Sequence, residues 1–213
     1  MVFSDRVSAG ILLGEYIKDK IDRELNPIVL GIPRGGVVVA KEVARVLSLP
    51  MSLLIVRKLG VPQNPELAFG AIDPDGEVYL DRKTVGYFKI SEDTIKQVAQ
   101  EELKKIRERE RTFLKGKMPE VRDREVIVVD DGIATGYTVI AGVNFVKRKG
   151  AVKVLVASPV CPTDTIRKIK EYADEVYCYY ESDEPSFAVG MFYRDFHEVR
   201  DEEVMELLKN GVL

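Results

Sequence analysis

The segment Val126–Thr138, which reads VIVVDDGIATGYT, constrains the fold of this chain more than any other segment does. Its first four residues are Val or Ile, a composition typical of a strand that is buried on both faces of a sheet. The strand ends abruptly at Asp130 and Asp131. Because ligands of open parallel sheets bind outside the carboxyl ends of the strands, we expect the chemistry of the chain at this point.

The residues that follow the two aspartates suit a phosphate group. Gly132 and Gly136 permit unusual backbone angles and close approach, while Thr135 and Thr138 bring hydroxyl groups to the start of the next helix. Alternatively, the aspartates only end the strand and cap that helix, but capping explains one aspartate and leaves the second without a task. No Gly-Lys-Ser or Gly-Lys-Thr follows, which disfavours a Walker-type loop.

Strands and helices alternate along most of the chain, which predicts an α/β fold with a mostly parallel central sheet flanked by helices. We expect strands at 27–31, 52–56, 125–130, 152–157 and 175–179, and a β-hairpin at 68–72 and 77–80. We expect helices at 5–21, 37–47, 91–113, 138–149, 164–172 and from 201 to 210–211. No repeat or linker divides the chain, so residues 1–213 are read as one domain.

The composition excludes some classes of function. The 32 basic and 35 acidic side chains nearly cancel, so the overall charge does not favour a nucleic-acid partner. The sequence has no signal-peptide pattern and no apolar run long enough to cross a bilayer. We therefore predict a cytoplasmic protein with neither nucleic acid nor membrane as a partner.

Two further stretches suit anions. In GIPRGG, residues 31–36, Gly35 and Gly36 can turn their N–H groups toward an anion, and Arg34 offers a permanently charged fork. Arg57 and Lys58 follow the second expected strand and begin a loop. The alternatives are an ordinary strand-to-helix turn for the first stretch and solvated surface for the second.

The segment Val126–Thr138 resembles the ribose-phosphate motif of type I phosphoribosyltransferases. GIPRGG resembles the pyrophosphate loop of that family, Arg57-Lys58 resembles its basic pair, and residues 59–71 resemble a poorly characterised branch. The resemblance implies the type I fold with a small hood, at about 86–118 and/or 181–213, and a flexible loop near the hairpin. It also implies a magnesium-dependent transferase of nucleotide metabolism that moves the 5-phosphoribosyl group from phosphoribosyl pyrophosphate to a small nitrogenous acceptor, such as a nucleobase, with release of pyrophosphate.

The resemblance also assigns roles to residues. Asp130 and Asp131 would be catalytic and would hold the ribose hydroxyls directly or through magnesium-bound water. The residues implied to bind the 5-phosphate are Gly132, Ile133, Ala134, Thr135, Gly136, Tyr137 and Thr138. Those implied to bind pyrophosphate are Arg34, Gly35, Gly36, Arg57 and Lys58.

The acceptor side is less well specified. Residues 186–196 distantly resemble the base-binding end of hypoxanthine and xanthine enzymes, which implies a stacking role for Phe187, with Phe192 and Tyr193 as alternatives. Asp195 would approach magnesium or pyrophosphate. The alternative is an aromatic strand of the core. Ala134 stands where several purine enzymes carry an aspartate as a potential general base. Because other members, including adenine enzymes, also carry alanine there, this departure argues against the oxopurine pattern but not against a transferase, and the acceptor is not identified.

Two other functions stay open. A regulator could use the same pocket to sense phosphoribosyl pyrophosphate without turnover, and an enzyme could act on a phosphorylated sugar or nucleotide without base transfer. The charged helix 91–113 is expected to form a hood or a dimer surface with a solvated face. A homodimer is expected, because twofold dimers are the commonest assembly and are frequent in the family.

Overall fold

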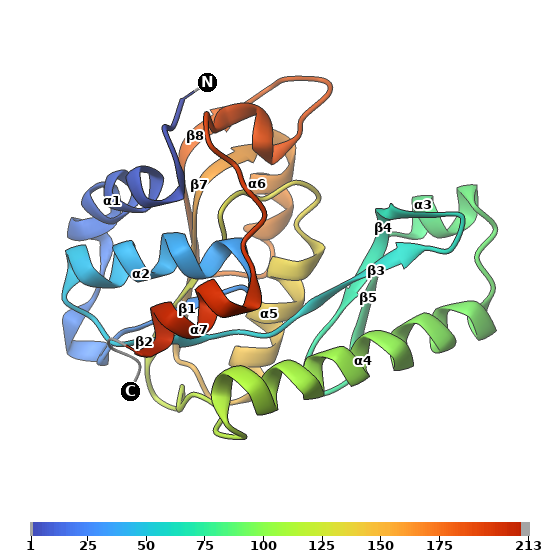
Figure 1. Cartoon of the computed structure of the whole chain (residues 1–213), viewed down its shortest axis with the longest axis horizontal. Coiled ribbons are helices and arrows are strands. Elements are labelled where there is room, and N and C mark those ends of the chain that lie inside the picture. The colour runs from blue at the N-terminus through green and yellow to red at the C-terminus, as the bar shows by residue number, and fades with distance from the viewer. Residues whose placement is uncertain (1, 210–213) are drawn as a thin grey trace.

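The computed structural model describes residues 2–209. Its central sheet contains five parallel strands, in the order β2 (Met51–Leu53), β1 (Ile28–Gly31), β6 (Glu125–Val129), β7 (Lys153–Pro162) and β8 (Glu175–Ser182). Helices lie on both faces of this sheet (Figure 1), which confirms the predicted α/β class. Among residues 2–209, no helix combines the length and apolar character that a bilayer crossing requires.

Both faces of the central sheet are buried, as the unbroken Val/Ile run in β6 predicts. Ile127 and Val129 belong to a core cluster with residues of α1 (Arg6–Ile17), α2 (Gly35–Leu47) and α7 (Asp201–Lys209). Val126 and Val128 point the other way and belong to a cluster with α5 (Tyr137–Arg148) and α6 (Thr163–Ile169). Because successive side chains of a strand alternate between faces, alternate residues of β6 pack against the helical layers on opposite sides of the sheet.

A lobe projects from this core (Figure 1). It contains a second, antiparallel sheet formed by β3 (Arg57–Val61), β4 (Asn64–Ile72) and β5 (Val78–Leu80). The chain continues through α3 (Arg82–Tyr87) into the long helix α4 (Glu92–Leu114). The Ser91 side chain caps α4 by accepting a hydrogen bond from the Thr94 N–H at 3.1 Å, which confirms the predicted start of that helix.

Several expected boundaries were wrong. The second strand of the core ends at Leu53 and not at Val56. Residues 54–56 are apolar and buried like a strand, but they form the crossing from one sheet to the other. Arg57 and Lys58 therefore begin strand β3 and do not begin a loop, and the predicted hairpin is part of a three-stranded sheet. Both residues still line one cavity with Asp130 and Asp131, which follow the core strand β6.

In the C-terminal half, two strands are longer than the sequence predicts. The β7 strand continues to Pro162 and not only to Ala157, because β8 also continues, to Ser182, and pairs with it. Helix α2 begins two residues earlier than expected, and α6 ends at Ile169. Short 3₁₀ helices occupy Lys18–Lys20, Arg23–Leu25 and Val189–Phe192. The predicted end of the last helix, at 210–211, lies outside the described residues.

Candidate active site

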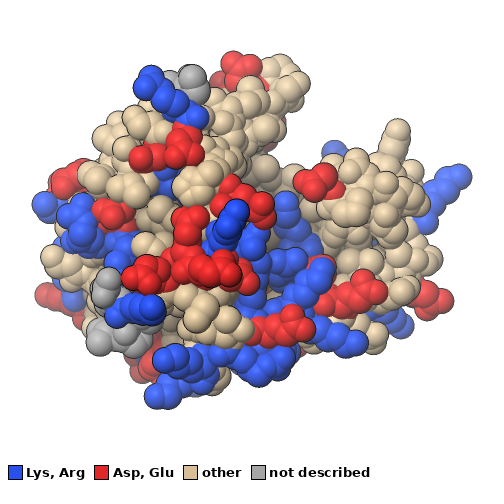
Figure 2. Space-filling view, in the orientation of Figure 1, with Lys and Arg blue, Asp and Glu red and all other residues tan. Residues whose placement is uncertain are grey.

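A cavity of about 940 Å³ opens between the core and the lobe. Figure 2 shows the molecule hollowed there, with Lys and Arg side chains gathered in the hollow. Its walls come from the loop 130–138 after β6, from strands β3 and β4, and from one face of α4. The predicted site residues that line it are Asp130, Asp131, Gly132, Ile133, Ala134, Thr135, Gly136, Tyr137, Thr138, Arg57 and Lys58.

The two aspartates lie side by side at the end of β6. The Asp131 N–H donates a hydrogen bond to Asp130 Oδ1 at 2.8 Å. Burial and the neighbouring charge of Asp131 raise the pKa of Asp130 well above its ordinary value. Because two adjacent carboxylates repel each other, a cation or hydroxyl donors bound here would be favoured.

An arginine from the first helix neutralises one of these carboxylates. Arg6 Nε donates to Asp131 Oδ2 at 2.9 Å, and the Arg6 side chain is only 8% exposed. A terminal nitrogen of Arg6 donates to the His197 carbonyl at 2.7 Å, and its guanidinium lies 4.0 Å from the ring centre of Phe196. Asp131 is therefore held by an ion pair that also fixes the segment at 196–197.

The loop after the aspartates leads directly into the N-terminus of α5. Gly136, at the N-cap, has φ +89°, in the left-handed region that glycine adopts at little cost. Helix α6 braces the loop, because the Thr165 hydroxyl donates to the Ala134 carbonyl at 2.6 Å and Lys168 Nζ donates to the Thr135 carbonyl at 2.9 Å. The resulting turn presents backbone N–H groups and threonine hydroxyls, as a phosphate site requires.

The GIPRGG stretch packs directly against the aspartates. A Cβ atom on Gly35 would lie 2.1 Å from Asp131 Oδ2, and one on Gly36 would lie 2.9 Å from Asp130 Oδ1. Only glycine fits such an approach. Arg34, in contrast, turns toward the C-terminal segment, where its terminal nitrogens contact Glu198 at 2.8 Å and Asp201 at 3.4 Å.

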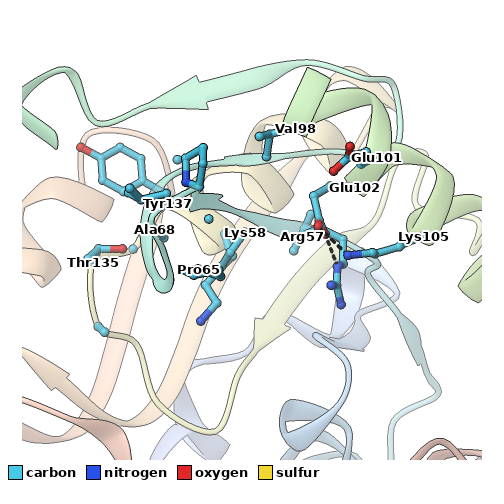
Figure 3. Close-up of a pocket in the computed structure, with 18 of the residues that line it drawn as sticks. Arg57, Lys58, Pro65, Ala68, Val98, Glu101, Glu102, Lys105, Thr135 and Tyr137 are labelled. Atoms are coloured by element: carbon cyan, nitrogen blue, oxygen red, sulfur yellow. Dashed lines mark hydrogen bonds and ion pairs between the residues drawn. The ribbon is translucent and has the colours of Figure 1, made fainter. Parts of the chain in front are cut away.

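The basic pair of β3 faces the cavity beside α4 (Figure 3). Arg57 Nε and Lys105 Nζ each contact a different oxygen of Glu102 at 2.8 Å. Although burial opposes ionisation, the hydrogen bonds from Lys105 and Arg57 keep the pKa of Glu102 below its ordinary value. Glu102 thus orients Arg57 through Nε and leaves the two terminal nitrogens of the guanidinium without a hydrogen-bond partner among residues 2–209.

One face of α4 forms a wall of the cavity. The lining residues of this helix are Thr94, Gln97, Val98, Glu101, Glu102, Lys105 and Arg109, which recur at the three- and four-residue spacing of one helical face. Burial, together with the positive charges of Arg57 and Arg34, lowers the pKa of Arg109 to about 10. The predicted solvated face of this helix is thus in part a wall of the site.

The family is identified by comparison with known proteins. A model of the phosphoribosyl transferase domain matches residues 8–195, which is most of the chain. This chain belongs to the phosphoribosyl transferase family. A protein of Mycobacterium tuberculosis (strain H37Rv), provisionally named a phosphoribosyl transferase, is 40% identical over 209 residues. That alignment covers 97% of this chain but 46% of the relative, so the chain spans about half the length of this curated protein.

Two further comparisons differ in extent. A uracil phosphoribosyltransferase of Clostridioides difficile is 34% identical over 67 residues, which cover 31% of this chain and 32% of that protein. The protein TT1426 from Thermus thermophilus, whose crystal structure is known, is 36% identical; the match covers 100% of both chains with a TM-score of 0.79. The whole fold, lobe included, is therefore similar to that of a solved protein.

The predicted acceptor residues of this chain lie outside the main cavity. Phe187 lines a second pocket, of about 390 Å³, which shares Ala134 and Thr135 with the main cavity. Phe192 and Tyr193 are buried, and the Tyr193 hydroxyl donates to the Asp131 carbonyl at 2.5 Å. Asp195 is exposed and contacts His197 at 3.1 Å. From the same segment, Val189 and Phe196 line the main cavity.

Sequence reasoning missed Arg6 and the α4 wall. No local motif marks Arg6, whose partner Asp131 is 125 residues away. The wall residues Glu102, Lys105 and Arg109 do share one helical face, but so do the charges of any solvated helix. Only the position of the lobe shows that this face of α4 lines a cavity and does not simply meet water.

Proposed function

We propose that the chain transfers the 5-phosphoribosyl group of phosphoribosyl pyrophosphate to a nitrogenous acceptor, such as a nucleobase, and releases pyrophosphate. The observation that carries the proposal is that the paired carboxylates Asp130 and Asp131, the phosphate loop 132–138 and the basic pair Arg57-Lys58 line one cavity. A substrate with a phosphate, a ribose ring and a pyrophosphate offers a matching group to each. Family membership supports the same reading.

In this proposal, the loop 132–138 grips the 5-phosphate with N–H and hydroxyl donors, and Asp130 and Asp131 hold the ribose hydroxyls. Arg34, Gly35, Gly36, Arg57 and Lys58 bind the pyrophosphate. Arg34 would have to exchange Glu198 and Asp201 for the substrate. Both partners are more than half exposed, so such an exchange costs little.

The residues present fit a magnesium ion that the substrate helps to hold. Among residues 2–209, no cluster of three or more His, Cys, Asp or Glu side chains could form a complete metal site. Mg²⁺ is usually bound by one or two carboxylates together with substrate phosphates and water, and Asp130 and Asp131 supply such a pair. When bound, the metal would neutralise charge on the pyrophosphate.

The side chains would stabilise both ends of the breaking bond. The bond from the anomeric carbon to the pyrophosphate oxygen breaks, and its electron pair leaves on that oxygen. A bond from the acceptor nitrogen to the anomeric carbon forms, and the proton of that nitrogen passes to water. Positive charge develops on the ribose ring beside Asp130 and Asp131, and negative charge develops on the leaving group beside Arg57 and Lys58. The loop contributes by positioning the sugar.

The acceptor site is proposed at residues 187–195. Phe187 is the stacking candidate, and its pocket adjoins the phosphate loop through Ala134 and Thr135, whereas no residue of α4 lines that pocket. Phe192, Tyr193 and Asp195 would support it; the contact between Phe187 and Phe192, whose ring centres are 5.2 Å apart, would hold the stacking ring in place.

The test is pyrophosphate release from phosphoribosyl pyrophosphate with magnesium across a panel of nucleobases and other amines, with binding measured alongside. Release that depends on one acceptor class supports the transferase and identifies the acceptor. Tight binding with no release for any acceptor would favour a sensor of phosphoribosyl pyrophosphate, and absence of binding would overturn both functions.

A further inference from the structure

The cationic side chains of the cavity are not neutralised equally. Lys105 and Arg57 share Glu102, each at 2.8 Å. Arg109, one turn along the same face of α4, forms no ion pair or hydrogen bond with any of residues 2–209. Arg109 therefore lines the cavity while the donors of its guanidinium are unused among residues 2–209.

The surroundings of Arg109 add positive charge. The charges of Arg57, on β3, and Arg34, at the N-cap of α2, both act on Arg109, while Asp201 and Glu102 oppose them only in part. Asp201 is itself paired with Arg34, and Glu102 with Arg57 and Lys105. Two permanently charged guanidinium groups from separate elements, those of Arg57 and Arg109, therefore line the same cavity, and the charge of Arg34 adds to theirs from outside it.

We propose that Arg109 contacts the pyrophosphate group of the bound substrate, so that α4 contributes a side chain to the pyrophosphate subsite. The proposal rests on the proposed function for the identity of the substrate. A diphosphate fits this position for two reasons. It carries several negative charges, enough to engage Arg109 together with Arg57, and its oxygens match the planar forks of guanidinium groups.

The geometry of α4 makes Arg109 suitable for this role. The lining residues of the helix face the loop 130–138 across the same cavity, and Glu102 already fixes Arg57 at the neighbouring position. Because an anion bound there would be partly shielded from water, each charge-assisted hydrogen bond would be stronger than one on the surface.

The experiment compares Arg109→Gln with Arg111→Gln. Arg111 lies two residues away on α4, is exposed and is not one of the cavity-lining residues, so it controls for the loss of one charge from this helix. Each protein is titrated calorimetrically with magnesium pyrophosphate and, separately, with ribose 5-phosphate. A thermal melt of each unliganded protein reports whether the fold is intact.

We expect Arg109→Gln to weaken pyrophosphate binding by about tenfold or more and to change ribose 5-phosphate binding by less than about twofold. Arg111→Gln should bind both as the wild type does. Wild-type pyrophosphate affinity in Arg109→Gln, equal loss of both ligands, or no pyrophosphate binding by the wild type would each overturn the inference. A wild type that binds pyrophosphate but transfers to no acceptor would refute the transferase and leave the subsite standing.

Discussion

Arg6 Nε donates to Asp131 Oδ2 at 2.9 Å, and this ion pair joins the first helix of the chain to the carboxylate pair of the candidate site. The same guanidinium holds the backbone of His197 and the ring of Phe196. Arg6 is therefore a positioning residue, which acts through Asp131 and not on the substrate itself. This side chain ties both α1 and the segment at 196–197 to Asp131.

Replacing Arg6 tests that role. Arg6→Gln leaves Asp131 partly buried without a counter-charge, so we expect the free energy of unfolding to fall by about 2–4 kcal/mol and binding of phosphoribosyl pyrophosphate to weaken. Urea unfolding and calorimetry measure the two effects. In a cycle with Asp131→Asn, the double variant should lose less stability than the two single variants together; strictly additive losses would mean that the pair is not coupled.

The close approach of Gly35 to the Asp131 carboxylate predicts that one added methyl group disturbs the binding site. Gly35→Ala would place a Cβ 2.1 Å from Asp131 Oδ2, so the loop or the aspartate must move. We expect binding of phosphoribosyl pyrophosphate to weaken by at least about tenfold. Gly86→Ala is the matched control, because nothing lies within 4 Å of the added methyl. Equal binding by both variants would contradict this account of the loop.

The carboxylate pair predicts a stability that depends on pH. The pKa of Asp130 is raised by burial and by Asp131, so the folded state binds a proton there more tightly than the unfolded state does. Asp130 therefore contributes fully to the free energy of unfolding of the unliganded protein at low pH. This contribution is lost as the pH rises from about 3.8, the ordinary pKa of the group, through its higher pKa in the folded state.

Asp130→Asn separates this stability effect from function. We expect it to raise the thermal midpoint of the unliganded protein at neutral pH, because it removes one of two adjacent carboxylates while an amide oxygen can still accept the Asp131 N–H. Binding of magnesium and phosphoribosyl pyrophosphate should be lost. A midpoint equal to or below that of the wild type would argue against mutual repulsion in the pair.

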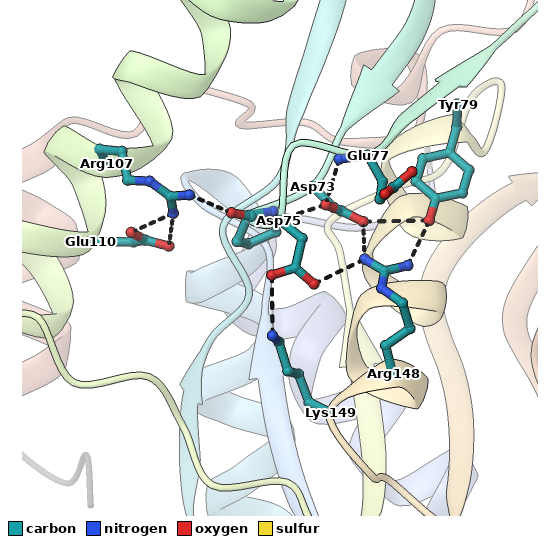
Figure 4. Close-up of polar contacts among 9 residues, drawn as sticks. Asp73, Asp75, Glu77, Tyr79, Arg107, Glu110, Arg148 and Lys149 are labelled. Carbon is teal, nitrogen blue, oxygen red and sulfur yellow. Dashed lines mark hydrogen bonds and ion pairs between the residues drawn. The ribbon is translucent and has the colours of Figure 1, made fainter.

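A polar network at the base of the lobe predicts a further effect on stability (Figure 4). Arg148, at the end of α5, contacts the fully buried carboxylate of Asp73 in the turn between β4 and β5. Arg148→Met would leave Asp73 without a counter-charge, so we expect a loss of about 2–4 kcal/mol in urea unfolding. Lys149→Met is the control, since its partner Asp75 is 35% exposed, and should cost at most about 1 kcal/mol. Equal losses would show that burial of Asp73 is not decisive.

Local sequence determined much of the fold. The Val/Ile run of β6 predicts a strand buried on both faces, and Ser91 with Glu92 and Asp93 predicts the start of α4, because these signals act over a few residues. The loop Asp130–Thr138 is likewise predictable, since the strand, the carboxylates and the glycines are contiguous in the chain. The structure brings these residues to one cavity with Arg57 and Lys58.

Tertiary structure alone decided the remaining features. Apolar residues 54–56 continue from β2 without a break, so the sequence does not show where the chain leaves one sheet for the other, because burial looks the same in both. The partners of Arg6 and Arg34 lie more than a hundred residues away along the chain. Whether the charged face of α4 meets water or a cavity depends on where the lobe is held, and that position is set by packing and ion pairs between distant segments, which leave no local pattern.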